Sequence, residues 1–437
     1  MNDKRFIHLI HRYYPFRGGS ESYFQSLSEQ LSADGADVRL LTTDAWDLEY
    51  FWNPDKKRVD APFERHNGVK IYRTPVRHLP LANFTHRAIR RGMGELSRAP
   101  FPFRKRMLFG LSRFGPWVPE LPALLERVGE NADLIHPANI ALESLIRESS
   151  TFARANDIPL VITPKLHLGE DENSVVRRYY TMPHQVELLQ QADLVMTQTS
   201  VESDFLSSVG VSEDRLRVVG LGINIQDVTG GNGRRARDRL GVDGPIVLSL
   251  GAAAYDKGTV HSCQAVLSLN RRRSTPVTIV VAGPIMSDFQ TYFDSLTDEE
   301  RRHIRVLGYV DDESRTDLLA ACDLLTLASR TEAFGYVFLE AWANGKPVIG
   351  ARAGGIPAVI DDGVDGLLVP FNDVDRLAAA MDSILSDDDL ARSLGEAGKS
   401  RKVVDTGTWY RKVISGYRDV MGSSDSEGVD DEAVNPW

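Results

Sequence analysis

The sequence predicts an α/β protein built from two doubly wound domains. Short apolar runs of strand length alternate with amphipathic helical patterns along both halves of the chain. Glycines follow several of these runs, at the carboxyl ends of strands where parallel sheets carry their ligand-binding loops. The length of 437 residues suffices for two or three domains with full cores. We therefore expect two Rossmann-like domains that face each other across a cleft.

The first domain is predicted to span residues 1–225. A strand over residues 4–11 is followed by a turn at Gly18-Gly19, an amphipathic helix that Gly35 ends, and a strand over residues 37–43. In this β-loop-α-β unit the glycines lie between strand and helix, where α/β sheets bind ligands. Further strands are predicted over residues 69–73, 134–136, 160–163 and 194–198.

The second domain is predicted to span residues 226–405. Its strands are expected over residues 246–250, 277–282, 304–307, 324–327 and 347–350. Residues 224–243 are rich in Gly, Arg and Asp and are predicted to form the linker. An amphipathic helix over residues 406–421 is expected to cross back to the first domain. Residues 422–437 hold five acids and no base, which predicts a disordered tail.

Composition excludes several classes of protein. The formal charge of −10 argues against a general nucleic-acid binder. No apolar stretch approaches the length of a membrane-spanning helix, and the first residues lack a signal-peptide core. Only Cys263 and Cys322 occur, which rules out a disulfide framework and fits a reducing cytoplasm. No Cys/His cluster has zinc spacing.

Two carboxylates, Glu332 and Glu340, mark the candidate site. They bracket Phe334-Gly335, and the residues around Glu340 are otherwise apolar. Glu340 is therefore predicted to lie alone in a buried helix, where an unpaired carboxylate is costly. Either a donor inside the protein or the hydroxyl groups of a ligand must satisfy it. Glu332 lies at the helix entry, which favours anions, and Gly335 permits close approach of a ligand. The alternative is a first-turn acid followed by a satisfied core glutamate.

Glycine-rich loops follow the predicted strands of the second half. Residues 251–258 form one such loop with a single cation, Lys257. Any one of these loops is compatible with an ordinary turn. Because all of them lie at carboxyl ends of strands, they are expected to face one cleft and to bind a phosphate-bearing ligand. The other loops are Gly283-Pro284, Gly308-Tyr309-Val310 and Gly354-Gly355 before Pro357.

Residues 84–114 form a basic segment with interleaved aromatic side chains, opposed by Glu95 alone. Two interpretations stay open. The segment lies on an anionic membrane surface, or it is a solvated helical insertion that packs on the first domain.

The carboxylate motif and the glycine-rich loops, taken in their order along the chain, resemble those of the family 4 glycosyltransferases, which are retaining enzymes of the GT-B fold. The specific motif is Glu-x7-Glu, here Glu332 and Glu340 within Ser-Arg-Thr-Glu-Ala-Phe-Gly. The resemblance is densest from residue 193 to residue 373 and weak from residue 46 to residue 128. Similar segments are Gly18-Gly19 with Glu21, residues 214–224, 256–258, 306–310, 353–357 and 366–370.

The resemblance implies a nucleotide diphosphate sugar as donor, bound mainly by the second domain. It implies that Glu340 holds the ribose hydroxyls, that Glu332 holds hydroxyls of the donor sugar, and that Lys257 pairs with the diphosphate. His167 matches the family's first-domain histidine near the transferred sugar, and the alternative is an ordinary loop histidine. Backbone contacts are implied at Phe334 and Gly335 for the sugar or phosphates, at Tyr309 and Val310 for the nucleobase, and at Gly18 and Gly19 for the diphosphate.

The family has no obligate metal, and the sequence shows no convincing Asp-x-Asp motif, so neither a metal nor another cofactor is expected. The hypothesis is a cytoplasmic enzyme, peripheral at the inner face of the membrane, that extends a lipid-linked or cell-envelope glycan. Three positions depart from the family pattern: Ala252 replaces a usual Arg, Ala358 a frequent acid and Asn224 a common Asp. A non-catalytic nucleotide-sugar-binding subunit, which Ala252 favours, and a GT-B epimerase stay open. A phosphorylase and a dehydrogenase lack their signatures.

Overall fold

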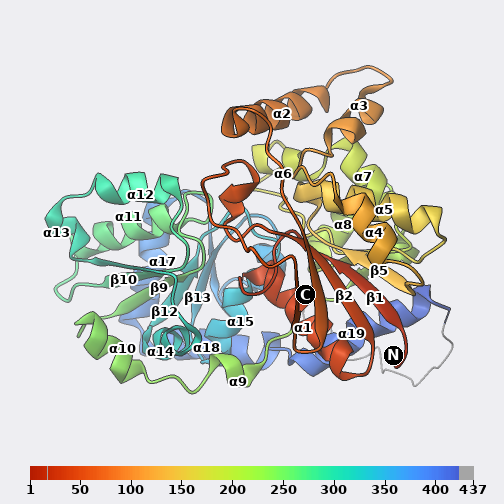
Figure 1. Cartoon of the computed structure of the whole chain (residues 1–437). Coiled ribbons are helices and arrows are strands. Elements are labelled where there is room, and N and C mark those ends of the chain that lie inside the picture. Colours follow the sequence, from red (N-terminus) through yellow and green to blue (C-terminus); the bar gives the residue numbers. More distant parts are fainter. Residues whose placement is uncertain (17, 423–437) are drawn as a thin grey trace. The chain divides into compact units, whose positions relative to one another are not determined.

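The computed structural model describes residues 1–16 and 18–422. By its internal contacts the chain divides into two compact units (Figure 1). Among the described residues, unit 1 contains Met1–Leu166, Arg177–Val219 and Tyr410–Gly422, and unit 2 contains His167–Val176 and Gly220–Trp409. Apart from Gly422, the tail predicted over residues 422–437 lies outside the described residues.

Unit 1 is built on parallel strands in the order β3-β4-β2-β1-β5, with β3 antiparallel at the edge, and on a second sheet in the order β6-β7-β8. Single bridges from β5 to the β6 region, at Ile135–Leu160 and Ala138–Thr163, connect the two sheets. Helix α1 packs on β2, and α5 packs on β5. The strands are β1 (Arg5–Leu9), β2 (Asp37–Thr43), β3 (Phe63–His66), β4 (Val69–Thr74), β5 (Leu134–Pro137), β6 (Val161–Ile162), β7 (Leu194–Thr197) and β8 (Leu216–Val218).

The helices connect these strands in a doubly wound arrangement, as the alternating pattern predicts. They are α1 (Gly19–Ala33), α2 (Ala82–Leu96), α3 (Arg104–Leu111), α4 (Leu121–Val128), α5 (Glu143–Ala155), α6 (Val175–Tyr180), α7 (Pro183–Gln190) and α8 (Ser200–Ser208), with short 3-10 turns at Leu48–Phe51, Ile140–Leu142 and Glu213–Arg215.

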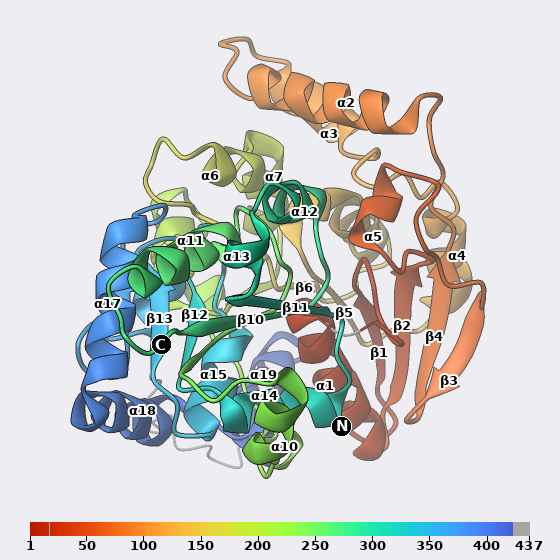
Figure 2. The same cartoon turned by 90° about the vertical axis from the view of Figure 1, so that its left-hand side faces the viewer.

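Unit 2 has one parallel sheet of six strands in the order β11-β10-β9-β12-β13-β14. This is the Rossmann strand order, in which the chain starts at the centre and winds outward in both directions. Figure 2 shows α11 and α12 on one face of this sheet and α14 and α15 on the other. The strands are β9 (Ile246–Leu250), β10 (Thr278–Ala282), β11 (Ile304–Gly308), β12 (Leu324–Leu327), β13 (Val348–Ala351) and β14 (Leu367–Val369).

Residues 224–243, predicted as a linker, form two helices instead. Helix α10 packs on α14, where Arg235 pairs with the buried Asp317. Asn224 caps the start of α9, and Asn232 and Gly241 cap the two ends of α10. The helices of this part of the chain are α9 (Ile225–Val228), α10 (Gly233–Leu240), α11 (Thr259–Asn270), α12 (Ser287–Asp294), α13 (Asp298–Arg301), α14 (Asp312–Ala321), α15 (Tyr336–Ala343), α16 (Ile356–Val359), α17 (Val374–Ser386), α18 (Asp388–Lys402) and α19 (Thr406–Val420).

Helix α19 belongs to unit 1 from Tyr410 onward, where its side chains enter the core of the first sheet. The Tyr417 hydroxyl lies 2.5 Å from His136 Nδ1 and 3.1 Å from His8 Nε2. A phenol can donate one hydrogen bond and accept another, so it can bridge two neutral imidazoles. Burial lowers the pKa of His8 to about 3 and also lowers that of His136, which keeps both rings neutral.

We expect the free energy of unfolding to decrease as the pH falls from about 6.5 towards 3. In this window an unfolded chain protonates its histidines, whereas folded His8, with its pKa lowered to about 3, does not. Each such histidine adds about 1.4 kcal/mol per pH unit to the slope. Urea unfolding at several pH values measures it, and His8→Gln should flatten the slope. An unchanged slope in His8→Gln would contradict the assignment.

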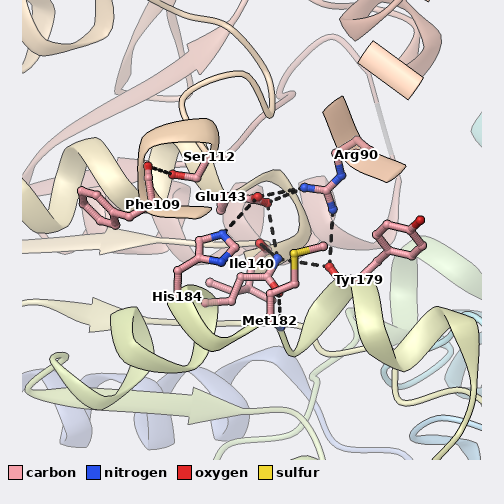
Figure 3. A network of polar contacts seen from close by, with 9 residues as sticks. Arg90, Phe109, Ser112, Ile140, Glu143, Tyr179, Met182 and His184 are labelled. Atoms are coloured by element: carbon pink, nitrogen blue, oxygen red, sulfur yellow. Dashed lines mark hydrogen bonds and ion pairs between the residues drawn. The ribbon is translucent and has the colours of Figure 1, made fainter. Parts of the chain in front are cut away.

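Helices α2 and α3 form an insertion that is anchored on unit 1 (Figures 1 and 2). Met93 of α2, Leu108 of α3 and Met182 before α7 make a small apolar cluster. Beside it, Arg90 Nη1 donates to both oxygens of the fully buried Glu143, at 2.8 and 3.0 Å (Figure 3). Burial alone would raise the pKa of Glu143, but the Arg90 guanidinium and the contact with His184 together outweigh it and lower that pKa. The insertion therefore packs on its domain, as one interpretation predicted.

Candidate functional site

The site in unit 2 lies where its sheet changes winding direction. Strands β9 and β12 are neighbours at this point, and the chain leaves them in opposite directions. Ligands of open α/β sheets bind outside the carboxyl ends of strands at such a switch point. The two loops that begin there contain Lys257, after β9, and Glu332, after β12. The sequence placed both residues in one site, and the fold brings them together.

Lys257 and Glu332 form an ion pair, with Lys257 Nζ 2.8 Å from Glu332 Oε2. The ammonium group also donates to the Thr331 carbonyl at 2.6 Å. About a quarter of the Lys257 side chain and a fifth of the Glu332 side chain are exposed, so a ligand can reach both. A cation beside a hydrogen-bonding carboxylate can hold a phosphate and a sugar hydroxyl at neighbouring positions.

The backbone of Glu332 is held by the Gly354-Gly355 pair after β13. Gly355 N–H donates to the Glu332 carbonyl at 2.9 Å. Gly354 has a φ of +58°, and a Cβ there would lie 2.2 Å from the same carbonyl oxygen. No larger residue fits this approach, so the loops after β12 and β13 are in direct contact.

Phe334 and Gly335 lie at the entry to helix α15, as expected. Phe334 is buried, and Gly335 is the N-cap with a φ of +97°. A Cβ on Gly335 would meet the Phe338 ring at 2.5 Å, so the sharp entry requires glycine. Tyr309 and Val310 follow β11, which is the strand at one edge of the sheet, and Tyr309 is 60% exposed.

Glu340 is buried in α15 as predicted, but it is not alone. Arg315 on α14 donates through Nη2 to Glu340 Oε1, so for this oxygen the structure shows the internal donor that was one of the two alternatives. The other oxygen, Oε2, is buried with no hydrogen-bond partner among the described residues. Burial raises the pKa of Glu340 and Arg315 opposes that rise. Internal pairing thus satisfies half of the carboxylate, and half can still accept hydrogen bonds from a ligand.

His167 belongs by its contacts to unit 2, in the segment His167–Val176 that leaves unit 1 after Leu166. Gly354 N–H donates to the Gly169 carbonyl at 2.7 Å. Glu170 accepts from Arg330 Nη1 at 3.1 Å and from Ser174 Oγ at 2.7 Å. Burial raises the pKa of Glu170, but these hydrogen bonds outweigh it and lower the pKa.

Gly18 and Gly19 begin helix α1 in unit 1. Gly18 is the N-cap, and Glu21 in the first turn is buried. Arg12 pairs with Glu21 at 3.0 Å. A Cβ on Gly18 would lie 2.6 Å from Glu21 Oε2, so the glycine makes room for this carboxylate. The predicted loop glycines therefore stand beside a buried ion pair that sequence analysis missed.

Sequence analysis did not show which charged groups around the site pair with one another. Arg330 lies in the motif itself and bonds Asp256 through Nε at 2.8 Å, next to Lys257. Arg315 lies 25 residues before its partner Glu340. The isolation of Glu340 in an apolar helix signalled that a donor was needed, but nothing in the sequence indicated which base supplies it. Within residues 1–16 and 18–422, no three His, Cys, Asp or Glu side chains gather as metal ligands would.

Comparison with known families agrees with this geometry. Residues 18–222 match the "Glycosyl transferase 4-like domain" and residues 234–401 match "Glycosyl transferases group 1". Together the two matches cover most of the chain. The chain is a family 4 glycosyltransferase of the GT-B fold. The resemblance stated from the motifs is thereby confirmed, and so is the predicted fold class.

Curated relatives of this glycosyltransferase include D-inositol 3-phosphate glycosyltransferases. That of Mycobacterium marinum is 33% identical over 207 residues, covering 46% of the chain and 43% of the relative. That of Corynebacterium efficiens is 30% identical over 229 residues, covering 48% and 52%. The chain spans about half the length of the curated relatives it matches.

Solved structures extend the likeness of fold to almost the whole glycosyltransferase. Sucrose-phosphate synthase from Thermosynechococcus elongatus superposes with a TM-score of 0.70 at 21% identity, covering 96% of the chain and all of that structure. HepE of Anabaena in complex with UDP-glucose superposes with a TM-score of 0.69 at 18% identity, covering 95% and 99%. At these identities the likeness establishes the fold alone.

Proposed function

We propose that the protein transfers a hexose-type sugar from a nucleotide diphosphate sugar, bound by unit 2, to a hydroxyl group of an acceptor. The observation that carries the proposal is the Lys257–Glu332 pair at the switch point of the unit 2 sheet. Family membership supports it, and so does the UDP-glucose bound by HepE of Anabaena.

In the proposed reaction the bond between the anomeric carbon and the diphosphate breaks, and negative charge develops on the leaving phosphate. Lys257 stabilises this charge, while Glu332 accepts hydrogen bonds from hydroxyls of the sugar. The acceptor attacks on the face from which the diphosphate departs, so the configuration is retained and no carboxylate nucleophile is needed. The departing phosphate takes the acceptor's proton. The proposal requires no metal, and His167 contacts the transferred sugar.

Binding by Glu340 completes the proposed donor site. Its unpartnered Oε2 accepts a hydrogen bond from a ribose hydroxyl while Arg315 neutralises Oε1. Tyr309 and Val310 contribute backbone contacts to the nucleobase. Gly18 and Gly19 of unit 1 contribute backbone contacts to the diphosphate.

A second candidate is a non-catalytic nucleotide-sugar-binding subunit. Ala252 favours it, because the family's usual arginine at this position is one of two cations for the diphosphate. Donor binding without turnover under any acceptor would support this candidate and contradict transfer.

A thermal-shift screen of nucleotide diphosphates and their sugars tests the donor. A ligand at 100 times its dissociation constant stabilises a protein by about 2.7 kcal/mol, which is enough to rank candidates. Product analysis with the best donor then follows, with inositol 3-phosphate and a lipid-linked glycan as acceptors. A sugar found on an acceptor supports transfer, whereas a donor converted only to its stereoisomer would identify an epimerase.

The proposed acceptor is a lipid-linked or cell-envelope glycan, reached from the cytoplasmic surface of the membrane. Within residues 1–16 and 18–422 no helix combines the length and the apolar character needed to cross a bilayer. The anchored insertion instead has an outer face of bases and apolar side chains. On α2, Phe84, Arg87 and Arg91 share one exposed face, and Phe103, Arg106 and Met107 do so at α3. Such a face suits an anionic lipid surface.

We expect the protein to float with vesicles of anionic phospholipid and not with neutral vesicles. Each base at the surface contributes about 1 kcal/mol, so changing Arg87, Arg91, Lys105 and Arg106 to Gln should abolish flotation at physiological salt. The matched control changes four exposed bases of unit 2: Arg234, Arg271, Arg302 and Lys399. Equal flotation of both variants, or binding that is insensitive to salt, would contradict the membrane proposal.

A further inference from the structure

Arg330 lies inside the carboxylate motif, two residues before Glu332. The contacts of its side chain described below go to residues other than Lys257 and Glu332. Its Nε and Nη2 lie 2.8 and 2.7 Å from Asp256 Oδ1, and Asp256 precedes Lys257 in the loop after β9. Its Nη1 reaches Glu170 at 3.1 Å. One side chain thus connects three loops of unit 2: those that hold Lys257, Glu332 and His167.

The segment that contains His167 is fixed at two consecutive residues. The Gly169 carbonyl accepts from Gly354 N–H at 2.7 Å, and Glu170 pairs with Arg330. Gly354 packs against the Glu332 carbonyl, so both attachments lead to the loop of Glu332. Ser174 Oγ donates to the second oxygen of Glu170 at 2.7 Å, which aims the carboxylate at Arg330.

The Glu170–Arg330 pair is suited to holding a position. Both side chains are about 70% buried, where ion pairs are less screened than at the surface. The guanidinium is further confined by the Phe371 ring, whose centroid lies 5.0 Å away. The guanidinium of Arg330 is already paired with two carboxylates. Arg330 is therefore a poor substitute for the diphosphate-binding arginine that the family usually has at the position of Ala252.

We propose that Arg330 is a positioning residue that holds the segment His167–Val176, through Glu170, at a fixed distance from the Lys257–Glu332 pair. Its consequence for the reaction rests on the proposed function, in which His167 contacts the transferred sugar. Displacing a group by about 1 Å can lower a rate about a hundredfold, so loss of the pair should reduce kcat and leave donor affinity unchanged.

The test is a double-mutant cycle of Arg330→Gln and Glu170→Gln, with Arg392→Gln on the exposed Arg392–Asp389 pair as the control. We expect Glu170→Gln to lower kcat about tenfold or more, and the double variant to lower it no further than Arg330→Gln alone, because that variant also loses the contacts to Asp256; the donor dissociation constant and melting temperature should not change. Arg330→Lys should recover part of the rate. A large loss of donor affinity in Arg330→Gln but not in Glu170→Gln would overturn the proposal, because Arg330 would then bind the diphosphate.

Hydrogen exchange of residues 168–176 in the unliganded protein supplies a readout that needs no activity. Both single variants should speed exchange in this segment about tenfold or more. The control variant Arg392→Gln should exchange as the wild type does. If the wild type transfers no sugar from any donor, the proposed function fails while exchange still decides whether Arg330 orders the segment. Unchanged exchange in Glu170→Gln would overturn the proposal by itself.

Discussion

Replacing Lys257 with alanine is expected to lower kcat for sugar transfer at least a hundredfold. The ammonium group is the cation at the switch point, 2.8 Å from Glu332 Oε2, where the leaving diphosphate is proposed to lie. Removing one preorganised donor from developing negative charge typically costs about 3 kcal/mol, or a factor of 100 to 1,000. Steady-state kinetics with the donor identified by thermal shift measure the effect.

Lys399→Ala on the exposed side of α18 is the matched control, since it removes the same group far from the site in sequence and in a different element. Lys257→Arg separates charge from geometry: it keeps the cation but cannot reproduce the Nζ contact to the Thr331 carbonyl. A kcat for Lys257→Ala within threefold of the wild type would remove this lysine from the reaction.

Sequence reasoning identified the strands that are buried on both faces. The strands β9 and β12 coincide with their predicted ranges, because their nearly continuous Val, Leu and Ile runs leave few alternatives. The strands β3, β8 and β14 were not predicted. Strand β3 alternates exposed and half-buried residues as an antiparallel edge, and β8 and β14 have only three residues each. Short or edge strands are defined by their neighbours in the sheet, which a single sequence does not contain.

The predicted site residues of unit 2 come together only through long-range contacts. The sequence located Lys257 and Glu332 from their motifs, but their 2.8 Å contact depends on β9 and β12 being neighbours. The carboxylate motif hid the role of Arg330, because its partners Asp256 and Glu170 lie on other loops. Ion pairs between distant segments leave no periodic signal, so they are the part of a site that sequence reasoning misses most easily.

Because Glu340 is paired with Arg315, we expect substitutions of the two residues to lower the free energy of unfolding by different amounts. Arg315→Met leaves a buried carboxylate without its counter-ion and should lower the free energy of unfolding by about 3 to 5 kcal/mol. Glu340→Gln keeps the shape and should cost less. The double variant should recover most of the stability lost in Arg315→Met, which urea unfolding at neutral pH measures.

Affinity for the donor should depend on Glu340, the other residue of this pair. In the proposed site Glu340 Oε2 accepts from the ribose, and a hydrogen bond to a charged group contributes about 1.5 to 3 kcal/mol. Glu340→Gln should therefore raise the donor's dissociation constant about tenfold to a hundredfold, with a smaller loss of stability than in Arg315→Met. The same substitution should affect a ribose-free diphosphate far less. If affinity for both ligands changed equally, Glu340 would be a structural partner of Arg315 alone, and the ribose would have to be bound elsewhere.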